Sequence, residues 1–249
     1  MSDLALITGA AVRVGKAIAV HLARRGFSVA IQYRNSKAEA EATAAEIAAL
    51  GSRAACFKAD LSRHADVQAL LPAVNAAMGR VTCLVNSASH FADDRVETLT
   101  EATFDAPMAV NLKTPVFLAQ GFAAQLGADD KGNIVNIIDQ RVLRPNPQFF
   151  SYTLSKAALW AATKTMAQGL APRIRVNAIA PGPTLASIYQ TPDEFEHEAR
   201  STLLGHGTSP EEIARAVAFL LDSPAITGQM IALDGGQHLL WQTPDIRVT

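Results

Sequence analysis

Hydrophobic and polar positions alternate between two patterns from one end of the chain to the other. Short apolar or β-branched runs, such as GNIVNII at 132–138, predict strands buried on both faces. Longer segments between them carry apolar residues at helical spacing. The predicted strands are 4–8, 28–33, 54–59, 82–86, 132–138, 173–180 and 230–233. The predicted helices are 14–25, 37–50, 65–78, 101–126, 152–170 and 210–221.

This alternation of strands and helices predicts an α/β fold with a parallel sheet. Parallel neighbours need crossover connections, which are right-handed, so successive βαβ units build a doubly wound sheet with helices on both faces. Seven strands are predicted along the chain, so we expect a single sheet of about seven strands. The chain has 249 residues and is 49% hydrophobic, which suits one domain with a large core. No linker or repeat marks a second domain, so we predict a single domain over residues 1–249.

One long irregular segment interrupts the alternation. Residues 181–207 contain three prolines and three glycines, with a short acidic helical pattern around 192–202. Long segments of this kind in compact domains are often lids over a binding site. We therefore predict a substrate loop at about 183–207.

Charge and cysteine content narrow the class of function. The 22 basic and 23 acidic residues give a formal charge of −1 without a basic run, which argues against nucleic acid or an anionic membrane as partner. A small-molecule substrate is expected instead. The N-terminus lacks the charged and apolar regions of a signal peptide or membrane span, so a soluble, cytoplasmic protein is expected. Cys56 and Cys83 lie in separate predicted strands as core thiols, and the histidines show no metal-ligand spacing, so no metal is predicted.

The sequence YTLSK at 152–156 carries the most informative chemistry. Tyr152 and Lys156 are one helical turn apart, so a helix starting near Tyr152 places the phenol and the ammonium on one face. A nearby ammonium favours the ionised phenol, so we expect Lys156 to lower the pKa of Tyr152 from about 10 and make it a better proton donor. Because an ordinary exposed helix can show the same spacing, the pair needs support from other motifs.

A glycine-containing turn, TGAAVRVG at 8–15, joins the first predicted strand to the first helix. Small residues let the backbone approach a pyrophosphate, and the helix N-terminus supplies free N–H groups. In dinucleotide-binding folds an acidic residue about twenty positions further on binds the ribose 2′-hydroxyl, whereas an arginine accommodates a 2′-phosphate. Here the second strand ends in IQYRNS, without an acid. Arg34 and Ser36 are therefore candidate 2′-phosphate ligands, which favours NADPH over NADH; the alternative is a solvated arginine at a strand end.

Taken together, these motifs resemble the short-chain dehydrogenase/reductase superfamily. The resemblance rests on the turn at 8–15, ADL at 59–61, NSAS at 86–89, Asn111 in NLK, YTLSK and the Pro181–Gly182 pair, in order along nearly the whole chain. It implies a Rossmann-type fold, an NADP-dependent oxidoreductase and a homotetramer. Small residues on the tyrosine helix would permit close packing between subunits: Ala157, Ala158, Ala161 and Ala162.

The resemblance also implies two sets of site residues. The catalytic set is Asp139, Tyr152, Lys156 and Asn111, of which Asn111 holds a water in a proton relay. The cofactor set has Asp60 at the adenine and the residues after Pro181 at the nicotinamide carboxamide. Its members are Gly9, Arg13, Val14, Gly15, Tyr33, Arg34, Asn35, Ser36, Asp60, Leu61, Asn86, Ser87, Ala88, Ser89, Tyr152, Lys156, Pro181, Gly182 and Thr184. The alternative to these two roles is that Asp60 caps a helix and that Asn111 is a structural residue.

Three departures from the commonest superfamily pattern resemble pteridine reductases and the related dihydropteridine and dihydromonapterin reductases. Arg13 replaces the middle glycine of the turn, Asp139 replaces the usual serine thirteen residues before Tyr152, and NSASHF replaces NNAG after the fourth strand. This resemblance implies that Arg13 lies between pyrophosphate and pterin and that Phe91 stacks on the pterin ring. Asp139 would join the tyrosine and the lysine in catalysis. The implied substrate set is Arg13, Ser89, Phe91, Asp139 and Tyr152; Ser87, where this subgroup usually has asparagine, departs even from it.

An aspartate also suits the chemistry of a pterin. Reducing a ring C=N requires a hydride at carbon and a proton at nitrogen, and a carboxyl group can relay that proton or accept hydrogen bonds from a 2-amino-4-oxo edge. For single residues the alternatives are Phe91 in the core, Arg13 serving only the pyrophosphate, and Asp139 paired with Arg141 or Arg144. For the whole protein they are an NADPH-dependent reductase of a small ketone or sugar, and a non-catalytic dinucleotide-sensing protein.

Overall fold

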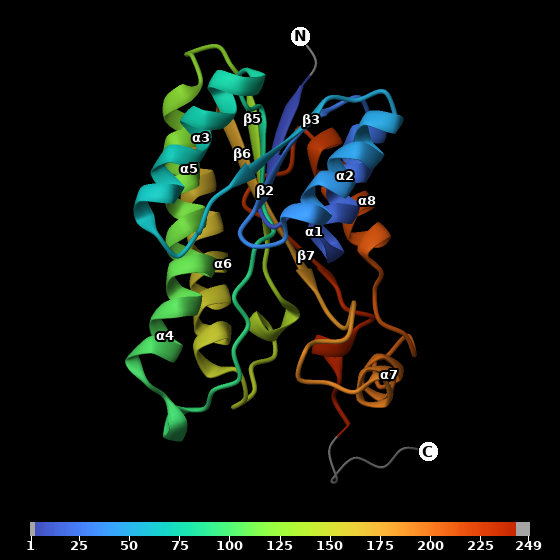
Figure 1. Cartoon of the computed structure of the whole chain (residues 1–249). Helices are drawn as coiled ribbons and strands as arrows, with labels where there is room; N and C mark the ends of the chain where they lie inside the picture. The colour runs from blue at the N-terminus through green and yellow to red at the C-terminus, as the bar shows by residue number, and fades with distance from the viewer. Residues whose placement is uncertain (1–2, 243–249) are drawn as a thin grey trace.

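A parallel sheet of seven strands runs through the centre of the molecule (Figure 1). The computed structural model describes residues 3–242, so the ends of the predicted domain, 1–2 and 243–249, lie outside the described residues. The strand order is β3-β2-β1-β4-β5-β6-β7, with parallel neighbours throughout. The strands are β1 (Leu4–Ile7), β2 (Ser28–Tyr33), β3 (Ala54–Lys58), β4 (Cys83–Asn86), β5 (Gly132–Ile137), β6 (Ile174–Pro181) and β7 (Met230–Leu233). The predicted doubly wound α/β fold is confirmed.

Helices cover both faces of this sheet (Figure 1). One face carries α1 (Arg13–Arg24), α2 (Lys37–Ala49) and α8 (Pro210–Asp222). The other carries α3 (His64–Met78), α5 (Thr114–Gln125) and α6 (Phe150–Leu170). The shorter helices α4 (Glu101–Pro107) and α7 (Pro192–Arg200) lie near the carboxyl ends of the strands. Short 3₁₀ turns occur at Val96–Thr98, Gln140–Val142 and Gln237–Leu239.

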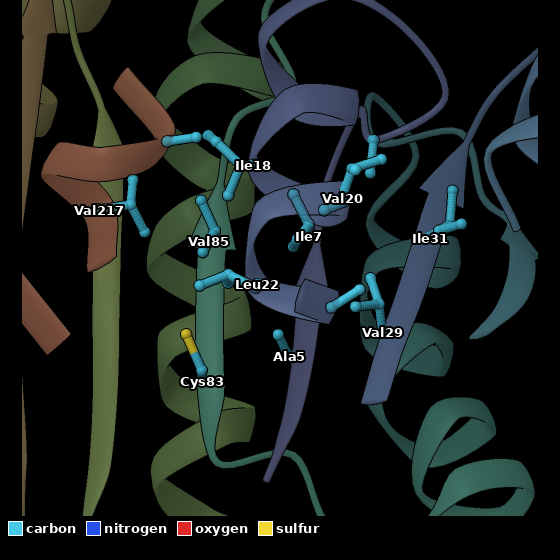
Figure 2. Close-up of a cluster of buried hydrophobic side chains, with 14 of the residues drawn as sticks. Ala5, Ile7, Ile18, Val20, Leu22, Val29, Ile31, Cys83, Val85 and Val217 are labelled. Atoms are coloured by element: carbon cyan, nitrogen blue, oxygen red, sulfur yellow. The ribbon is translucent and has the colours of Figure 1, made fainter. Parts of the chain in front are cut away.

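The continuous apolar runs of the strands fill two separate cores. Successive side chains of a strand point to opposite faces, so Ile7 belongs to the core beneath α1 and α8, whereas Leu6 belongs to the core beneath α3 and α5. Figure 2 shows the first of these cores, where Leu22 of α1 and Val217 of α8 flank Val85 of β4. Burial on both faces explains why the strands contain few polar positions.

The predicted helix 101–126 is interrupted, which corrects the sequence-based prediction. It consists of α4, a π-helical segment at Met108–Lys113 and α5. Pro107 has no backbone N–H to donate, so the regular helical hydrogen-bond pattern breaks at this point. Asn111 lies in the π-helical segment, and such segments are frequent at functional sites.

The strand order reverses between β1 and β4, and this reversal positions the site. The hydroxyl of Thr8, just after β1, accepts hydrogen bonds from the backbone N–H groups of Ser87 and Ala88, both at 3.0 Å. Gly9 has a φ of 66°, and a Cβ at Gly9 would lie 2.9 Å from the Cα of Ala88. The segments that follow β1 and β4 are therefore in close contact, at the place where ligands bind in open α/β sheets.

The remaining sequence-based expectations concern thiols, metals and membranes. Cys83 is buried, and its burial raises the pKa of its thiol to about 12; Cys56 is half-buried on β3. Within residues 3–242, no cluster of three or more histidine, cysteine or acidic side chains could hold a metal ion. The same part of the chain contains no helix long and apolar enough to cross a membrane. At the C-terminal end, Leu239 and Trp241 are exposed.

Candidate active site

A cavity of about 820 Å³ follows the carboxyl ends of the strands and gathers most of the predicted site residues. All the predicted cofactor-binding and substrate-binding residues line it except Asn86. Of the catalytic set, Asp139, Tyr152 and Lys156 line it and Asn111 does not. Residues from both halves of the chain thus meet in one site.

The turn at 8–15 forms one end of this cavity. Helix α1 begins at Arg13 without a side-chain cap, so its first backbone N–H groups are available to an anion. Gly15 packs so closely that a Cβ there would lie 2.3 Å from the carbonyl oxygen of Gly9. Gln32, which was not predicted, accepts a hydrogen bond from the N–H of Gly9 at 2.9 Å and donates to the carbonyl of Ala59 at 2.8 Å. These contacts hold the turn against β2 and β3 in a form that fits a pyrophosphate.

Arg34 follows β2 at the same end of the cavity. It is exposed, and it forms no ion pair with the other described residues. Asp60 accepts hydrogen bonds from the hydroxyl and the N–H of Ser62, which hold the pKa of Asp60 below its ordinary value. The Arg34 guanidinium forms no ion pair among the described residues, although its charge helps to lower the pKa of nearby Asp60, and a free guanidinium at the end of β2 fits a 2′-phosphate.

Asn86, a predicted cofactor-binding residue, is not among the residues that line the cavity, and its contact with the cofactor stays a prediction. Its side chain is buried and donates a hydrogen bond to Asn136 of the neighbouring strand β5 at 2.8 Å. Asn136 in turn donates to Thr163 of α6 at 2.9 Å. Asn86 therefore belongs to a buried polar chain between sheet and helix.

Tyr152 and Asp139 form a hydrogen-bonded pair at the other end of the cavity. The Tyr152 hydroxyl donates to Oδ2 of Asp139 at 2.8 Å, and Oδ1 accepts from the N–H of Arg141 at 2.8 Å. Burial raises the pKa of Asp139, because the charged carboxylate is poorly solvated. Burial and the negative charge of Asp139 together raise the pKa of Tyr152 well above its ordinary value. The pair can therefore hold and share a proton.

Lys156 has a different role in the structure from the one the sequence suggested. Its Nζ donates to the carbonyl oxygen of Ile137 at 2.8 Å and lies 5.7 Å from the centroid of the Tyr152 ring. Because the ammonium does not bond the phenol, the expectation that it lowers the pKa of Tyr152 is wrong for this structure. Burial lowers the pKa of Lys156 to about 8. Lys156 is thus a cation whose proton is released more easily than that of an ordinary lysine.

The Asn111 side chain is fully buried and forms hydrogen bonds to residues beside the cavity. Its Oδ1 accepts from the N–H of His90 at 2.7 Å, and its Nδ2 donates to the His90 carbonyl at 2.9 Å and to the Ser155 hydroxyl at 3.0 Å. These bonds support the structural alternative, because they tie the segment before Phe91 to helix α6. A role in a proton relay stays a prediction.

Phe91 lies in an aromatic cluster that the sequence did not reveal. Its ring stacks on Phe149 with centroids 4.2 Å apart and meets Tyr152 edge-on at 4.7 Å. Tyr189 of the loop lies near both stacked rings, with centroid distances of 5.9 and 5.8 Å. Phe149 has a φ of 53°, which is unusual for a bulky residue. Nothing in the local sequence predicts this conformation, so the partner of Phe91 could not be foreseen.

The predicted substrate loop is attached to the turn at 8–15. Nη1 and Nη2 of Arg13 donate to the carbonyl oxygens of Ala186 and Leu185 at 3.1 and 3.2 Å. Further along, Glu198 of α7 accepts from the side-chain amides of Gln190 and Gln237 at 2.6 and 3.0 Å. The predicted substrate loop contributes Leu185, Ile188, Gln190, Phe195 and Glu198 to the cavity lining. Lining residues that were not predicted as site residues include Gln32, His90, Gln140, Arg141 and Gln237.

Comparison with known proteins agrees with this geometry. The profile of a family described as Enoyl-(Acyl carrier protein) reductase matches residues 9–238. The 3-oxoacyl-[acyl-carrier-protein] reductase FabG of Staphylococcus epidermidis is 32% identical over 247 residues, covering 96% of this chain and 100% of the relative. A short-chain dehydrogenase/reductase from Serratia marcescens superposes with a TM-score of 0.89 at 31% identity, covering 95% of this chain and 98% of its own.

Greater similarity is found to another solved structure. The crystal structure of FolM Alternative dihydrofolate reductase 1 from Brucella suis, in complex with NADP, is 51% identical, with a TM-score of 0.95 and 98% coverage of both chains. The fold, the site and these similarities show that the chain belongs to the short-chain dehydrogenase/reductase superfamily. Proteins of this class are oxidoreductases, and the site geometry bears on which substrate is reduced.

Proposed function

We propose that this protein is an NADPH-dependent reductase of a pterin-type substrate, such as a dihydropterin, a dihydromonapterin or a dihydrofolate-like compound. The observation that carries this proposal is the hydrogen bond between Tyr152 and a buried carboxyl, Asp139, at the inner wall of the cavity. A serine there would suit a carbonyl oxygen, whereas a carboxyl can serve a ring nitrogen. The similarity to the Brucella suis dihydrofolate reductase supports the same choice.

NADPH is the proposed cofactor, and its phosphate groups fit donors already in place. The uncapped N-terminus of α1 would hold the pyrophosphate, and Arg34 with Ser36 would hold the 2′-phosphate. Bound NADPH would supply the hydride. NADP in the similar Brucella suis structure supports this proposal.

The chain's own residues would supply the proton. The raised pKa of Tyr152 keeps the phenol protonated at neutral pH, so its proton is present for a ring nitrogen. Once the phenol gives up that proton, Asp139 can replace it directly, whereas Lys156, whose ammonium bonds the Ile137 carbonyl, could do so only through an intervening group. Asp139 bonds the hydroxyl directly and has a raised pKa, while Lys156 has a pKa of about 8. Lys156 also fixes the end of β5 through the carbonyl of Ile137.

A carbonyl reductase is the second candidate, because the FabG relatives reduce an oxoacyl substrate according to their name. We further propose a homotetramer in the cytoplasm, with the alanine-rich face of α6 (Ala157, Ala158, Ala161, Ala162) at a subunit interface. Light scattering on the purified protein would give the number of subunits.

Following NADPH oxidation with dihydropterins, with simple ketones and with neither tests the proposed function. The Asp139→Ser variant makes this test decisive, because serine restores the residue usual for carbonyl reduction. For a pterin reductase we expect Asp139→Ser to lose roughly 10²- to 10⁴-fold in dihydropterin turnover, the usual contribution of a positioned acid–base group. A variant that keeps dihydropterin turnover and improves ketone reduction would favour the carbonyl reductase. If the wild-type protein turns over neither class yet binds NADPH, it is a sensing protein.

A further inference from the structure

Arg141 carries a buried donor that has no acceptor among residues 3–242. Its Nη1 atom is buried, and no residue in the described part of the chain accepts a hydrogen bond from it. Arg141 lines the same cavity as Asp139 and Tyr152, two residues after the aspartate. A guanidinium stays protonated at any ordinary pH, so it cannot avoid an unmade hydrogen bond by losing its proton. Buried donors without acceptors are rare in folded proteins and call for a specific explanation.

The position of this guanidinium is determined by two contacts. The backbone N–H of Arg141 donates to Asp139, which fixes where the side chain leaves the 3₁₀ turn Gln140–Val142. The guanidinium carbon lies 5.0 Å from the centroid of the Phe149 ring, in a cation–π contact. Phe149 is the residue that stacks on Phe91. Arg141 is therefore held at the aromatic end of the cavity, where the proposed substrate ring would lie.

Gln140, the neighbouring residue, adds an acceptor to this donor. It is buried, it lines the cavity, and its Oε1 has no hydrogen-bond partner among residues 3–242. Binding sites for small molecules commonly combine apolar walls with a few converging polar groups that fix orientation. An unpartnered donor and an unpartnered acceptor, on consecutive residues that line the same cavity as Asp139 and Phe91, have this arrangement.

We infer that Arg141 is a further substrate-binding residue, which donates from Nη1 to an acceptor oxygen or nitrogen of the substrate, with the Gln140 amide as its neighbouring acceptor. This inference rests on the proposed function, because it takes the substrate to be a pterin-type ring. The acceptor lies either on the ring or on its 6-substituent. Both sources offer the same chemistry, a lone pair on oxygen or nitrogen within reach of a guanidinium.

Steady-state kinetics of Arg141→Met test this inference, because methionine keeps much of the length of the side chain and removes its donors. The control is Arg215→Met, the same change at an exposed position of α8 outside the cavity. Three substrates are compared: a dihydropterin without a 6-substituent, one with a hydroxylated 6-substituent, and dihydrofolate. We expect the Michaelis constant of Arg141→Met to rise about tenfold or more, with kcat within a few-fold and the NADPH constant unchanged. Arg141→Lys, which keeps a donor, should recover part of the loss.

The three substrates separate the possible outcomes. A loss with all three places the acceptor on the ring, whereas a loss confined to the substituted compounds places it on the 6-substituent. Unchanged constants for all three, in a variant that melts like the wild type, would overturn the role of Arg141 and leave the proposed function intact. A rise in the NADPH constant alone would also overturn it. If the wild-type protein turns over none of the three compounds, the proposed function itself fails, and this inference fails with it.

Discussion

The cavity has a proposed nucleotide end, around the turn at 8–15 and Arg34, and a proposed substrate end, around Asp139, Tyr152 and Phe91. The two ends are built in different ways. At the nucleotide end the contacts come from short turns directly after β1, β2 and β3, and most are made by backbone groups of the turn at 8–15 or by Gln32. At the substrate end, side chains that are distant in the sequence meet, including Phe149 in a strained conformation and the buried Asp139 and Lys156. The positions of the groups at the nucleotide end therefore follow from the sheet, whereas the substrate end depends on contacts between side chains that are distant in the sequence.

The largest expected effect concerns the buried charge at the substrate end. Burial lowers the pKa of Lys156 from 10.5 to about 8, so the folded protein binds this proton less tightly than the unfolded chain. The stabilising contribution is complete above pH 10.5 and is lost as the pH falls toward 8. Relative to Lys156→Met, the wild type should gain about 3 kcal/mol in unfolding free energy between pH 8 and 10.5, at about 1.4 kcal/mol per pKa unit. Urea unfolding of both proteins at several pH values measures this difference; a difference independent of pH would contradict it.

The contrast between the two ends also explains what the sequence could predict. Strand positions and the lining of the nucleotide end follow from local patterns, because apolar runs define strands and each βα turn follows its strand directly. Asn86 and Asn111 carry the right motif, yet the Asn86 side chain bonds Asn136 and the Asn111 side chain bonds the backbone of His90, and spacing alone gives no sign of such bonds.

Phe149 and Arg141 show a second limit of sequence analysis. The left-handed backbone of Phe149 and the contact between its ring and Arg141 come from tertiary packing, which overrides local preference. The lowered pKa expected for Tyr152 failed for a related reason. Helical spacing placed Lys156 on the correct face, but the spacing could not show that its ammonium would bond the Ile137 carbonyl instead of the phenol.

At the nucleotide end the largest expected effect is that of Arg34→Ala. Charge-assisted hydrogen bonds contribute on the order of 1.5–3 kcal/mol, so the Michaelis constant for NADPH should rise at least tenfold while that for NADH changes little. Arg63→Ala is the matched control, because Arg63 is exposed, near Asp60 and outside the cavity lining. Equal losses with both cofactors would remove the assignment of Arg34 to the 2′-phosphate.

Phe91→Ala tests whether the aromatic cluster serves binding or only packing. Stacking of a heterocyclic base on an aromatic side chain is worth about 1–3 kcal/mol, so dihydropterin affinity should fall by that amount while NADPH affinity is retained. Phe149→Ala is the paired variant, because it removes the same ring stack from a residue outside the cavity lining. We expect Phe91→Ala to affect substrate affinity more than Phe149→Ala does, as measured by fluorescence titration. Similar affinities, with a large loss of thermal stability in both, would make Phe91 a core residue.

The smallest expected effect lies where the two ends meet, at Arg13. Its φ of 54° is unfavourable for any residue with a Cβ, and its guanidinium holds the carbonyl oxygens of Leu185 and Ala186. Arg13→Gly removes both the strain and the guanidinium, whereas Arg13→Ala removes only the guanidinium. The glycine variant should therefore be about 1 kcal/mol more stable than the alanine variant in urea unfolding. Both variants should show equally fast amide hydrogen exchange near residues 185–190, because both lose the same two hydrogen bonds. Equal stabilities would show that the turn is unstrained, and unchanged exchange would show that Arg13 does not hold the substrate loop, so that the two ends of the cavity are independent.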